Sequence, residues 1–283
     1  MRSILSFCFE NDDPASALMP FPLPENVSTL DQASKFLSEG AYTTFRTFSG
    51  RGVLRLDEHF HRLEASSKIA GFPLKVDSER WRGELREAIG QSPHETARIR
   101  IMVPFSTQKQ MVHFFISALS VPGQDKREKG VEIVTHQFHR STPEAKLTGF
   151  IQETDQLRKS LADGIEEVVM IDGEQRFLEG LTSNFYAVID GEIFTAGEGI
   201  LPGITRQIIL EIAQSAGIKV RFSAVRLAEM HHFEEAFITS SSRAVLPVTK
   251  IDAAQIGDGK PGKITRKLME LYELRVQAEL EYL

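Results

Sequence analysis

An amine, an acid and an anion-binding turn follow one another along the chain. The amine is Lys146, within residues 143–151, and the acid is Glu179, which opens the run 179–184. A Pro-Gly-Ile-Thr-Arg turn at 202–206 comes next, directly before a helical pattern. An uncharged lysine amine attacks carbonyl carbon, and the free N–H groups at the start of a helix bind phosphate. The order predicts covalent chemistry on a ligand that carries a carbonyl and a phosphate.

Length and composition limit the class of protein. At 283 residues the chain exceeds the usual size of a single core, so two α/β domains are expected. A net charge of −6 gives no electrostatic reason to expect nucleic acid. The single cysteine, Cys8, cannot form an internal disulfide and is expected to be a small apolar filler. The apolar run 4–9 is too short for a signal peptide or a membrane span, so a cytoplasmic setting is expected.

The first 120 residues predict a small N-terminal α/β domain. Prolines up to residue 25 predict an extended or irregular arm. Beyond the arm, hydrophobic periodicity predicts a hairpin, two helices and two strands, at residues 42–56, 57–70, 79–89, 97–103 and 111–119. Residues 121–130 are polar and rich in helix breakers, and predict a linker between domains.

Residues 131–283 predict a larger C-terminal domain, which contains the amine, the acid and the anion-binding turn and is therefore expected to bind the ligand. Its pattern predicts strands at 131–135 and 167–171, a hairpin at 185–194, and helices at 150–161, 204–216 and 268–278. These elements place Lys146 just before a helix, Glu179 at a strand end and the 202–206 turn at a helix start.

Six pieces of the sequence occur in the order known from one family. They are residues 40–46 (Gly-Ala-Tyr-Thr-Thr-Phe-Arg), 58–63 (Glu-His-Phe-His-Arg-Leu), Lys146, 179–184 (Glu-Gly-Leu-Thr-Ser-Asn), 201–206 and 240–248. Together they resemble the class IV, or fold-type IV, pyridoxal-phosphate enzymes. That family contains branched-chain aminotransferases, D-amino acid aminotransferases and aminodeoxychorismate lyase. The resemblance implies an α/β (α+β) protein, with two α/β domains that hold the cofactor between them, and a homodimer.

The resemblance also implies a role for each matched residue. Lys146 corresponds to the lysine that forms a Schiff base with pyridoxal 5'-phosphate and then shuttles a proton. Glu179 corresponds to the acid that keeps the ring nitrogen protonated. The phosphate is expected at Arg62, at the backbone of Ile204 and Thr205, and at Ser241. Without the resemblance, each of these side chains would be read as an exposed surface residue.

Substrate contacts are expected at Tyr42, Thr44, Arg46, Arg100 and Ser242, by the same correspondence. Two arginines could hold an α-carboxylate. Arg98 and Arg100 have the same parity on an alternating strand, so both are predicted to leave its apolar face together.

The first functional prediction is a transaminase that moves an amino group between a branched-chain L-amino acid and a 2-oxo acid. Aminodeoxychorismate lyase is the alternative, because that enzyme also has a threonine at the Thr44 position. A D-amino acid aminotransferase is the third candidate.

Departures from the family patterns at two places leave the substrate undecided. Ile151 replaces the cofactor-contacting tyrosine of branched-chain enzymes, and Pro-Phe-Ser at 104–106 replaces the Arg-Gly pattern of the lyase and the D-amino acid enzymes. A binding protein that kept the fold and lost turnover remains a further alternative. The intact Lys146 and Glu179 argue against it.

Other polar clusters predict no second chemistry. The histidine pairs 59 and 61, and 231 and 232, have no third ligand at a useful spacing, so no metal site is predicted. Ser240–Ser242 lacks the Gly-x-Ser-x-Gly pattern of a nucleophile elbow.

Overall fold

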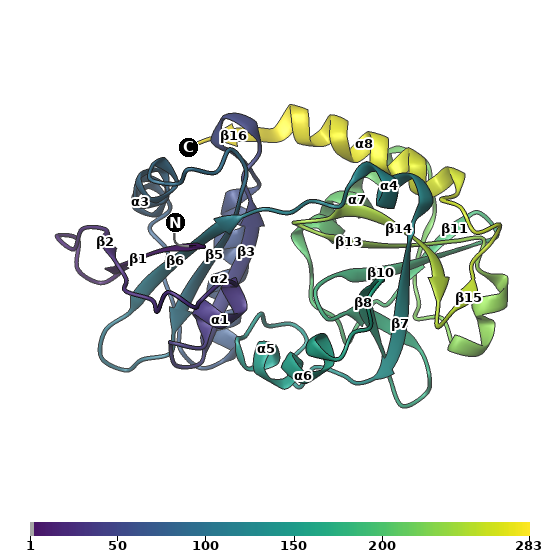
Figure 1. Ribbon diagram of the computed structural model, residues 1–283, viewed down its shortest axis with the longest axis horizontal. Helices are drawn as coiled ribbons and strands as arrows, with labels where there is room; N and C mark the ends of the chain where they lie inside the picture. The colour runs from purple at the N-terminus through teal and green to yellow at the C-terminus, as the bar shows by residue number, and fades with distance from the viewer. Residues whose placement is uncertain (1–2) are drawn as a thin grey trace. The chain divides into compact units, whose positions relative to one another are not determined.

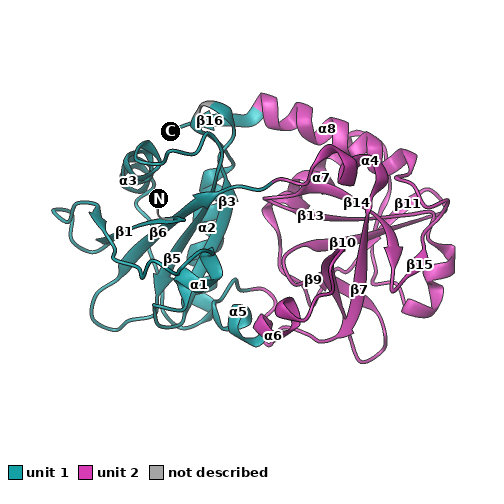
Figure 2. Ribbon diagram, viewed as in Figure 1, with its two compact units in different colours: residues 1–120, 145–153, 279–283 teal, residues 121–144, 154–278 magenta. Residues whose placement is uncertain are grey.

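The computed structural model describes residues 3–283, which divide into two compact units (Figure 2). The first unit holds the chain up to Ser120 together with Ala145–Glu153 and Glu279–Leu283, and the second holds Val121–Glu144 and Thr154–Ala278. The boundaries differ from the predicted 1–120, 121–130 and 131–283. The expected linker lies in the second unit, where Gln124–Lys129 form helix α4, which is followed by its C-cap Gly130 with φ +78°.

The first unit is built on a five-stranded antiparallel sheet of order β2-β1-β6-β5-β3 (Figure 1). Its strands are β1 (Ile4–Glu10), β2 (Met19–Pro20), β3 (Gly40–Arg46), β5 (Ala97–Pro104) and β6 (Met111–Ala118). Alternation on β5 sends Ile99 and Ile101 into a core shared with α2 (Leu56–Ile69) and α3 (Ser78–Gly90). Alternate residues of the same strands face a second cluster, which contains α1 (Leu30–Ser34).

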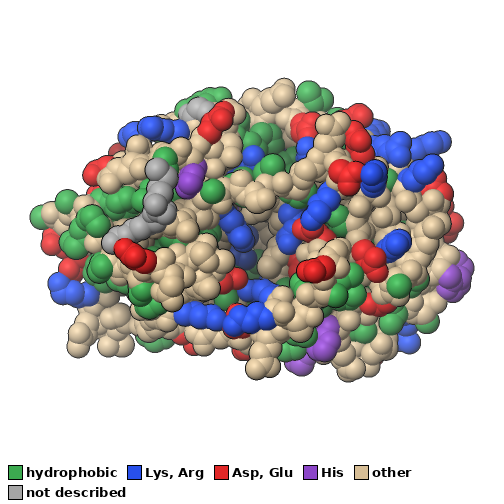
Figure 3. Space-filling view, viewed as in Figure 1, with side chains coloured by type: hydrophobic (Ala, Val, Ile, Leu, Met, Phe, Trp, Pro, Cys, Tyr) green, Lys and Arg blue, Asp and Glu red, His purple; other side chains and the backbone are tan. Residues whose placement is uncertain are grey.

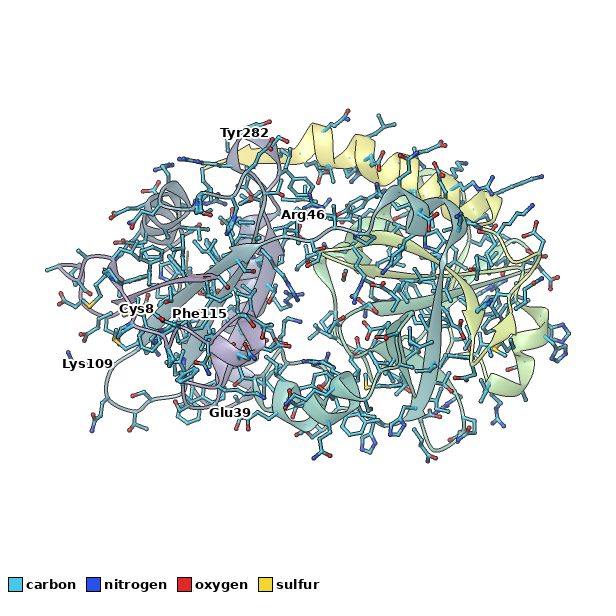
Figure 4. All side chains as sticks on the ribbon, in the orientation of Figure 1. Cys8, Glu39, Arg46, Lys109, Phe115 and Tyr282 are labelled. Carbon is cyan, nitrogen blue, oxygen red and sulfur yellow. The ribbon has the colours of Figure 1, made fainter. Side chains whose placement is uncertain are left out.

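The predicted irregular arm contains a regular strand. Phe7 and Phe9 of β1 enter the core under α2 and α3, and Cys8 points to the other face, where it is buried and unbridged (Figure 4). Strand β6, which carries Phe115, pairs with β1 along its full length. The prolines that suggested an arm lie beyond this strand, in the segment that follows Glu10.

The hairpin predicted at 42–56 does not form as a strand pair. A 3-10 turn, Ser49–Arg51, separates β3 from β4 (Gly52–Leu54), and β4 pairs with β16 (Leu280–Tyr282) (Figure 4). Glu281 also accepts a 2.7 Å hydrogen bond from the backbone N–H of Leu56, the first residue of α2. Residues 279–283 therefore support the start of α2.

The second unit is a nine-stranded sheet, and six of its strands form a closed ring. The strand order is β12-β11-β10-β13-β14-β7-β8-β9, and β9 also pairs with β10 through Glu179 and Asn184. The bounds are β7 (Val131–Gln137), β8 (Ile165–Ile171), β9 (Phe177–Gly180), β10 (Asn184–Ile189), β11 (Glu192–Thr195), β12 (Val220–Phe222), β13 (Glu235–Ser240), β14 (Ala244–Ile251) and β15 (Ala254–Gln255). Apolar side chains from β7, β8, β10, β13 and β14 form one core cluster.

Besides α4, one more helical region differs from its prediction. The helix expected at 150–161 breaks into α5 (Gly149–Glu153), which belongs to the first unit, and α6 (Asp155–Lys159), because Thr154 adopts a non-helical ψ of 3°. Helix α7 (Ile204–Ser215) matches its prediction, and a 3-10 turn covers Leu227–His232. Helix α8 (Lys263–Glu279) starts on buried Glu235, which accepts from the backbone N–H groups of Ile264 and Thr265 at 2.9 and 2.7 Å.

Charged residues of both signs share the surface. Figure 3 shows Lys and Arg side chains beside Asp and Glu side chains over the face in view. Among residues 3–283, no helix is both long enough and apolar enough to cross a membrane.

Candidate functional site

The predicted site residues fall into two groups, one in each unit. The first unit carries Tyr42, Thr44, Arg46, Arg62, Arg100 and Lys146, and the second carries Glu179, Ile204, Thr205, Ser241 and Ser242. Each group has its own buried hydrogen-bond network.

Lys146 is held to the first unit by its backbone. Its N–H donates to Ser66 Oγ on α2 at 3.0 Å, and its C=O accepts from the N–H of Tyr42 on β3 at 2.9 Å. The half-buried side chain brings Nζ to 4.8 Å from the centre of the Tyr42 ring. A strand and a helix therefore fix the position of this amine, although the residue lies in an irregular segment.

Arg62 is tied to β3 through a chain of two hydrogen bonds. One guanidinium nitrogen of Arg62 donates to Thr43 Oγ1 at 2.8 Å, and Thr43 Oγ1 lies 2.7 Å from Nδ1 of His59. Burial, together with the charges of Arg62 and Lys146, holds the pKa of His59 well below its usual value. Neutral His59 can therefore accept a hydrogen bond from the Thr43 hydroxyl, while Thr43 Oγ1 accepts one from Arg62. This order of donors and acceptors holds the Arg62 guanidinium in place.

Arg100 is engaged by α1. It is 2% exposed and forms a 2.7 Å ion pair with Asp31. It also donates to Ser34 Oγ at 2.8 Å and to Thr44 Oγ1 at 3.3 Å, and its guanidinium carbon lies 4.7 Å from the centre of the Tyr42 ring. Arg100 therefore donates four hydrogen bonds within the first unit, one of them to the backbone C=O of Leu30.

Arg46 and Thr44 lie on the same face of β3 as Tyr42, as their alternating positions require. The Arg46 guanidinium carbon lies 4.4 Å from the centre of the Phe48 ring (Figure 4). Ile151, the departure from the branched-chain pattern, is 2% exposed and packs in the apolar cluster that contains Tyr42.

Glu179 is a buried acid with a buried arginine beside it. The two side chains are 2% and 4% exposed, and Arg140 Nε donates to Glu179 Oε1 at 2.7 Å. Asn184, opposite Glu179 across the β9–β10 pair, donates to Oε2 at 3.1 Å. Two donors of different charge therefore hold an ionised carboxylate in a fixed orientation.

Asn184 also reaches the turn that begins α7. Its side-chain nitrogen donates to the C=O of Leu201 at 2.9 Å. A Cβ on Gly203 would lie 2.3 Å from Asn184 Oδ1, so the close approach requires glycine at the N-cap of α7. One amide therefore links the acid to the turn at 201–203.

The start of α7 has the features of an anion site. Ile204 and Thr205 are its first two helical residues and are 7% and 5% exposed. Gly203 makes no side-chain cap, so first-turn N–H groups remain available to an anion. The helix dipole adds to the attraction.

Ser241 and Ser242 lie in the turn between β13 and β14, and both are half-buried. Arg243 in the same turn donates to Thr182 Oγ1 at 2.8 Å, and Thr182 Oγ1 donates to the buried carboxylate of Glu167 at 2.6 Å. The turn after Glu179 and the serine turn are therefore tied together within the second unit.

Three residues that bond to the predicted site residues were not predicted from the sequence as site residues. Arg140 lies in an irregular stretch, and Thr43 and Asn184 were quoted only as parts of motifs. Asn184 could have been identified as the polar residue opposite a predicted acid in a strand pair. That step required recognising that β9 and β10 pair across a short turn. Among residues 3–283, no three His, Cys, Asp or Glu side chains form a cluster able to hold a metal ion.

Comparison with known proteins identifies the family. The sequence profile of the family described as amino-transferase class IV matches residues 40–251. The chain belongs to this family. It is an aminotransferase by family membership, and the predicted family is confirmed.

Individual relatives carry two different names. A probable branched-chain-amino-acid aminotransferase of Thermotoga maritima is 30% identical over 248 residues, which cover 84% of this chain and 87% of the relative. A D-alanine aminotransferase of Listeria monocytogenes is 29% identical over 262 residues, with coverages of 86% and 90%.

The solved structures confirm the predicted fold class. A branched-chain amino acid aminotransferase crystallised with pyridoxamine 5'-phosphate superposes with a TM-score of 0.81 over 98% of each chain, at 21% identity. The branched-chain amino acid aminotransferase of Escherichia coli superposes with a TM-score of 0.78 over 97% of this chain and 96% of its own, at 22% identity. The two α/β units are therefore those of a fold-type IV protein.

Proposed function

We propose that this aminotransferase binds pyridoxal 5'-phosphate, with Lys146 as the reactive amine and Glu179 as the acid at the ring nitrogen. The observation that carries the proposal is the linkage of Glu179, through Asn184, to the turn that opens α7. A buried acid and an anion site that are linked by one amide suit a molecule with a basic ring nitrogen at one end and a phosphate at the other.

The residues of the second unit fit this molecule. Glu179 is 2% exposed, and only a strong interaction repays the cost of burying its charge. A protonated ring nitrogen would supply such an interaction, in addition to Arg140. The uncapped start of α7 and the hydroxyl of Ser241 offer donors to a phosphate.

The residues of the first unit supply the amine and a cation. Arg62, held by Thr43, would donate to the phosphate, and a forked guanidinium suits that anion. Lys146 Nζ, near the Tyr42 ring, would be the tether and afterwards the proton carrier.

The bound coenzyme supplies a conjugated ring that accepts the electron pair released when a substrate Cα loses its proton. Lys146 Nζ would take that proton and later return one. Glu179 would hold a proton at the ring nitrogen, and Arg140 and Asn184 would keep its carboxylate oriented. The start of α7 would hold the phosphate and so keep the coenzyme anchored during turnover.

We propose a branched-chain L-amino acid as the amino donor and a 2-oxo acid as the acceptor, in a cytoplasmic homodimer. The relative in Thermotoga maritima supports this donor. D-alanine is the second candidate, because the Listeria monocytogenes relative is 29% identical, against 30% for the Thermotoga maritima relative. The lyase reaction, which was the first alternative from the sequence, becomes the third candidate, and in the structure the Thr44 hydroxyl accepts a hydrogen bond from Arg100.

A donor panel tests the proposal. Protein loaded with pyridoxal phosphate should absorb in the visible region, and borohydride should then attach the coenzyme covalently to Lys146. L-leucine should bleach the band and yield a 2-oxo acid. Bleaching by D-alanine alone would favour the second candidate, and release of pyruvate from aminodeoxychorismate alone would favour the lyase. A protein that binds no coenzyme, or Lys146→Ala with full turnover, would refute the proposal.

A further inference from the structure

Arg206 is a buried cation that pairs with no carboxylate among residues 3–283. It is 7% exposed, and its guanidinium donates to Thr195 Oγ1 and to the C=O of Ala196, both at 2.9 Å. Both partners are neutral. Among the described residues, the other two buried arginines, Arg100 and Arg140, each have a carboxylate oxygen at 2.7 Å.

Nearby ionisable groups do not balance this charge. Tyr186 lies within reach of Arg206, but burial raises the pKa of its phenol even though the Arg206 charge opposes that rise, so the phenol stays neutral. Glu179 is already paired with Arg140. Phe222, which is 60% exposed, offers only its ring, whose centre lies 5.6 Å from the Arg206 guanidinium carbon.

A buried charge without a counter-charge is unfavourable unless a ligand provides one. Arg206 is the third residue of α7, in the same first turn as Ile204 and Thr205. Side chains in a first turn lean toward the helix N-terminus, where an anion would bind. The Arg206 guanidinium also holds Ala196, the residue after β11, in the segment that leads to the N-cap Gly203.

We propose that Arg206 supplies an additional positive charge for the coenzyme phosphate, and that the phosphate is its missing counter-ion. This inference rests on the proposed function. Arg206 acts over a distance, through the field at the start of α7, and keeps its own bonds to Thr195 and Ala196. As a general scale, two unit charges about 10 Å apart at an effective dielectric constant of about 20 change an affinity by more than tenfold.

The test compares pyridoxal phosphate with pyridoxal, which lacks the phosphate. The dissociation constants of both are measured by calorimetry on the coenzyme-free protein, for the natural protein, Arg206→Met and Arg206→Lys. Arg221→Met is the matched control, because Arg221 is an exposed arginine of the same unit. Arg206→Met should weaken the binding of pyridoxal phosphate by tenfold or more and should change the affinity for pyridoxal less than twofold. Arg206→Lys should recover most of the loss, and Arg221→Met should change neither.

A second measurement separates a charge effect from a structural one. Inorganic phosphate should raise the Tm of the natural coenzyme-free protein and should raise that of Arg206→Met much less. Equal weakening of both ligands, together with a lower Tm of the coenzyme-free variant, would overturn the inference and leave Arg206 as a brace for Ala196. If the natural protein bound both ligands equally well, the phosphate site of the proposed function would itself be refuted.

Discussion

Removing Arg140 should leave a buried carboxylate that must take up a proton. Arg140 and Glu179 are 4% and 2% exposed and 2.7 Å apart, so Arg140→Met removes a cation that water cannot replace. Protonating an ordinary glutamate at pH 7 costs about 3–4 kcal/mol, which agrees with the roughly 3–5 kcal/mol lost when one partner of a buried pair is removed. We therefore expect the free energy of unfolding to fall by about 3–4 kcal/mol at pH 7.

The loss should depend on pH in a defined direction. In the variant the folded state binds a proton that the unfolded state lacks at neutral pH, so acid favours folding. The stability deficit should therefore shrink steadily from pH 7 to pH 5. Urea unfolding followed by circular dichroism measures the free energy of unfolding at each pH. The control, Arg221→Met, breaks an exposed ion pair with Glu192 and should lower the free energy of unfolding by less than about 1 kcal/mol.

A double-mutant cycle completes the experiment. Glu179→Gln in the Arg140→Met background should restore part of the lost stability, since no charge then remains to be buried. An Arg140→Met protein whose stability at pH 7 matches that of the natural protein would refute the reasoning. A deficit that stays constant from pH 7 to pH 5 would refute it equally.

Three further perturbations have defined outcomes. Arg62→Ala should weaken coenzyme binding by about 2–3 kcal/mol, measured by equilibrium dialysis; unchanged affinity would remove Arg62 from the phosphate site. Gly203→Ala places a Cβ 2.3 Å from Asn184 Oδ1 and should cost about 1–3 kcal/mol of stability and weaken coenzyme binding. Its control, Gly83→Ala, meets no atom within 4 Å and should be neutral or stabilising. Burial lowers the pKa of His113 from 6.5 to about 4, so relative to His113→Phe the natural protein should lose up to about 3 kcal/mol of stability from pH 6.5 to pH 4; a constant difference between the two unfolding curves would contradict this.

Local periodicity was enough to predict most elements of the fold. Helices α2, α3 and α7 and strands β5 to β8 follow from apolar spacing, because one face of each packs in a core. The pairing of β4 with β16 joins residues more than 200 positions apart, and no local pattern carries that information. The break at Thr154 was missed because apolar spacing continues across it.

The local backbone of the candidate site was predictable where a motif has a fixed local shape. The first turn of α7 and the segment of Lys146 follow directly from the motifs at 201–206 and at Lys146. The partners of Glu179 and Arg62 could not be predicted, since Arg140 and Thr43 reach them across strand pairings and helix packing that a sequence does not state. Arg100 shows the same limit, because its ion pair with Asp31 depends on where α1 packs.

The strand formed by residues 280–282 has a practical consequence for anyone who handles this enzyme. Glu281 bonds to the first N–H of α2, and Glu279 pairs with Arg55 at 2.9 Å just before that helix. Trimming the last five residues, or fusing a bulky affinity tag to them, would loosen the helix that carries Arg62. Weak coenzyme retention in a tagged preparation would then report on the purification strategy and not on the enzyme.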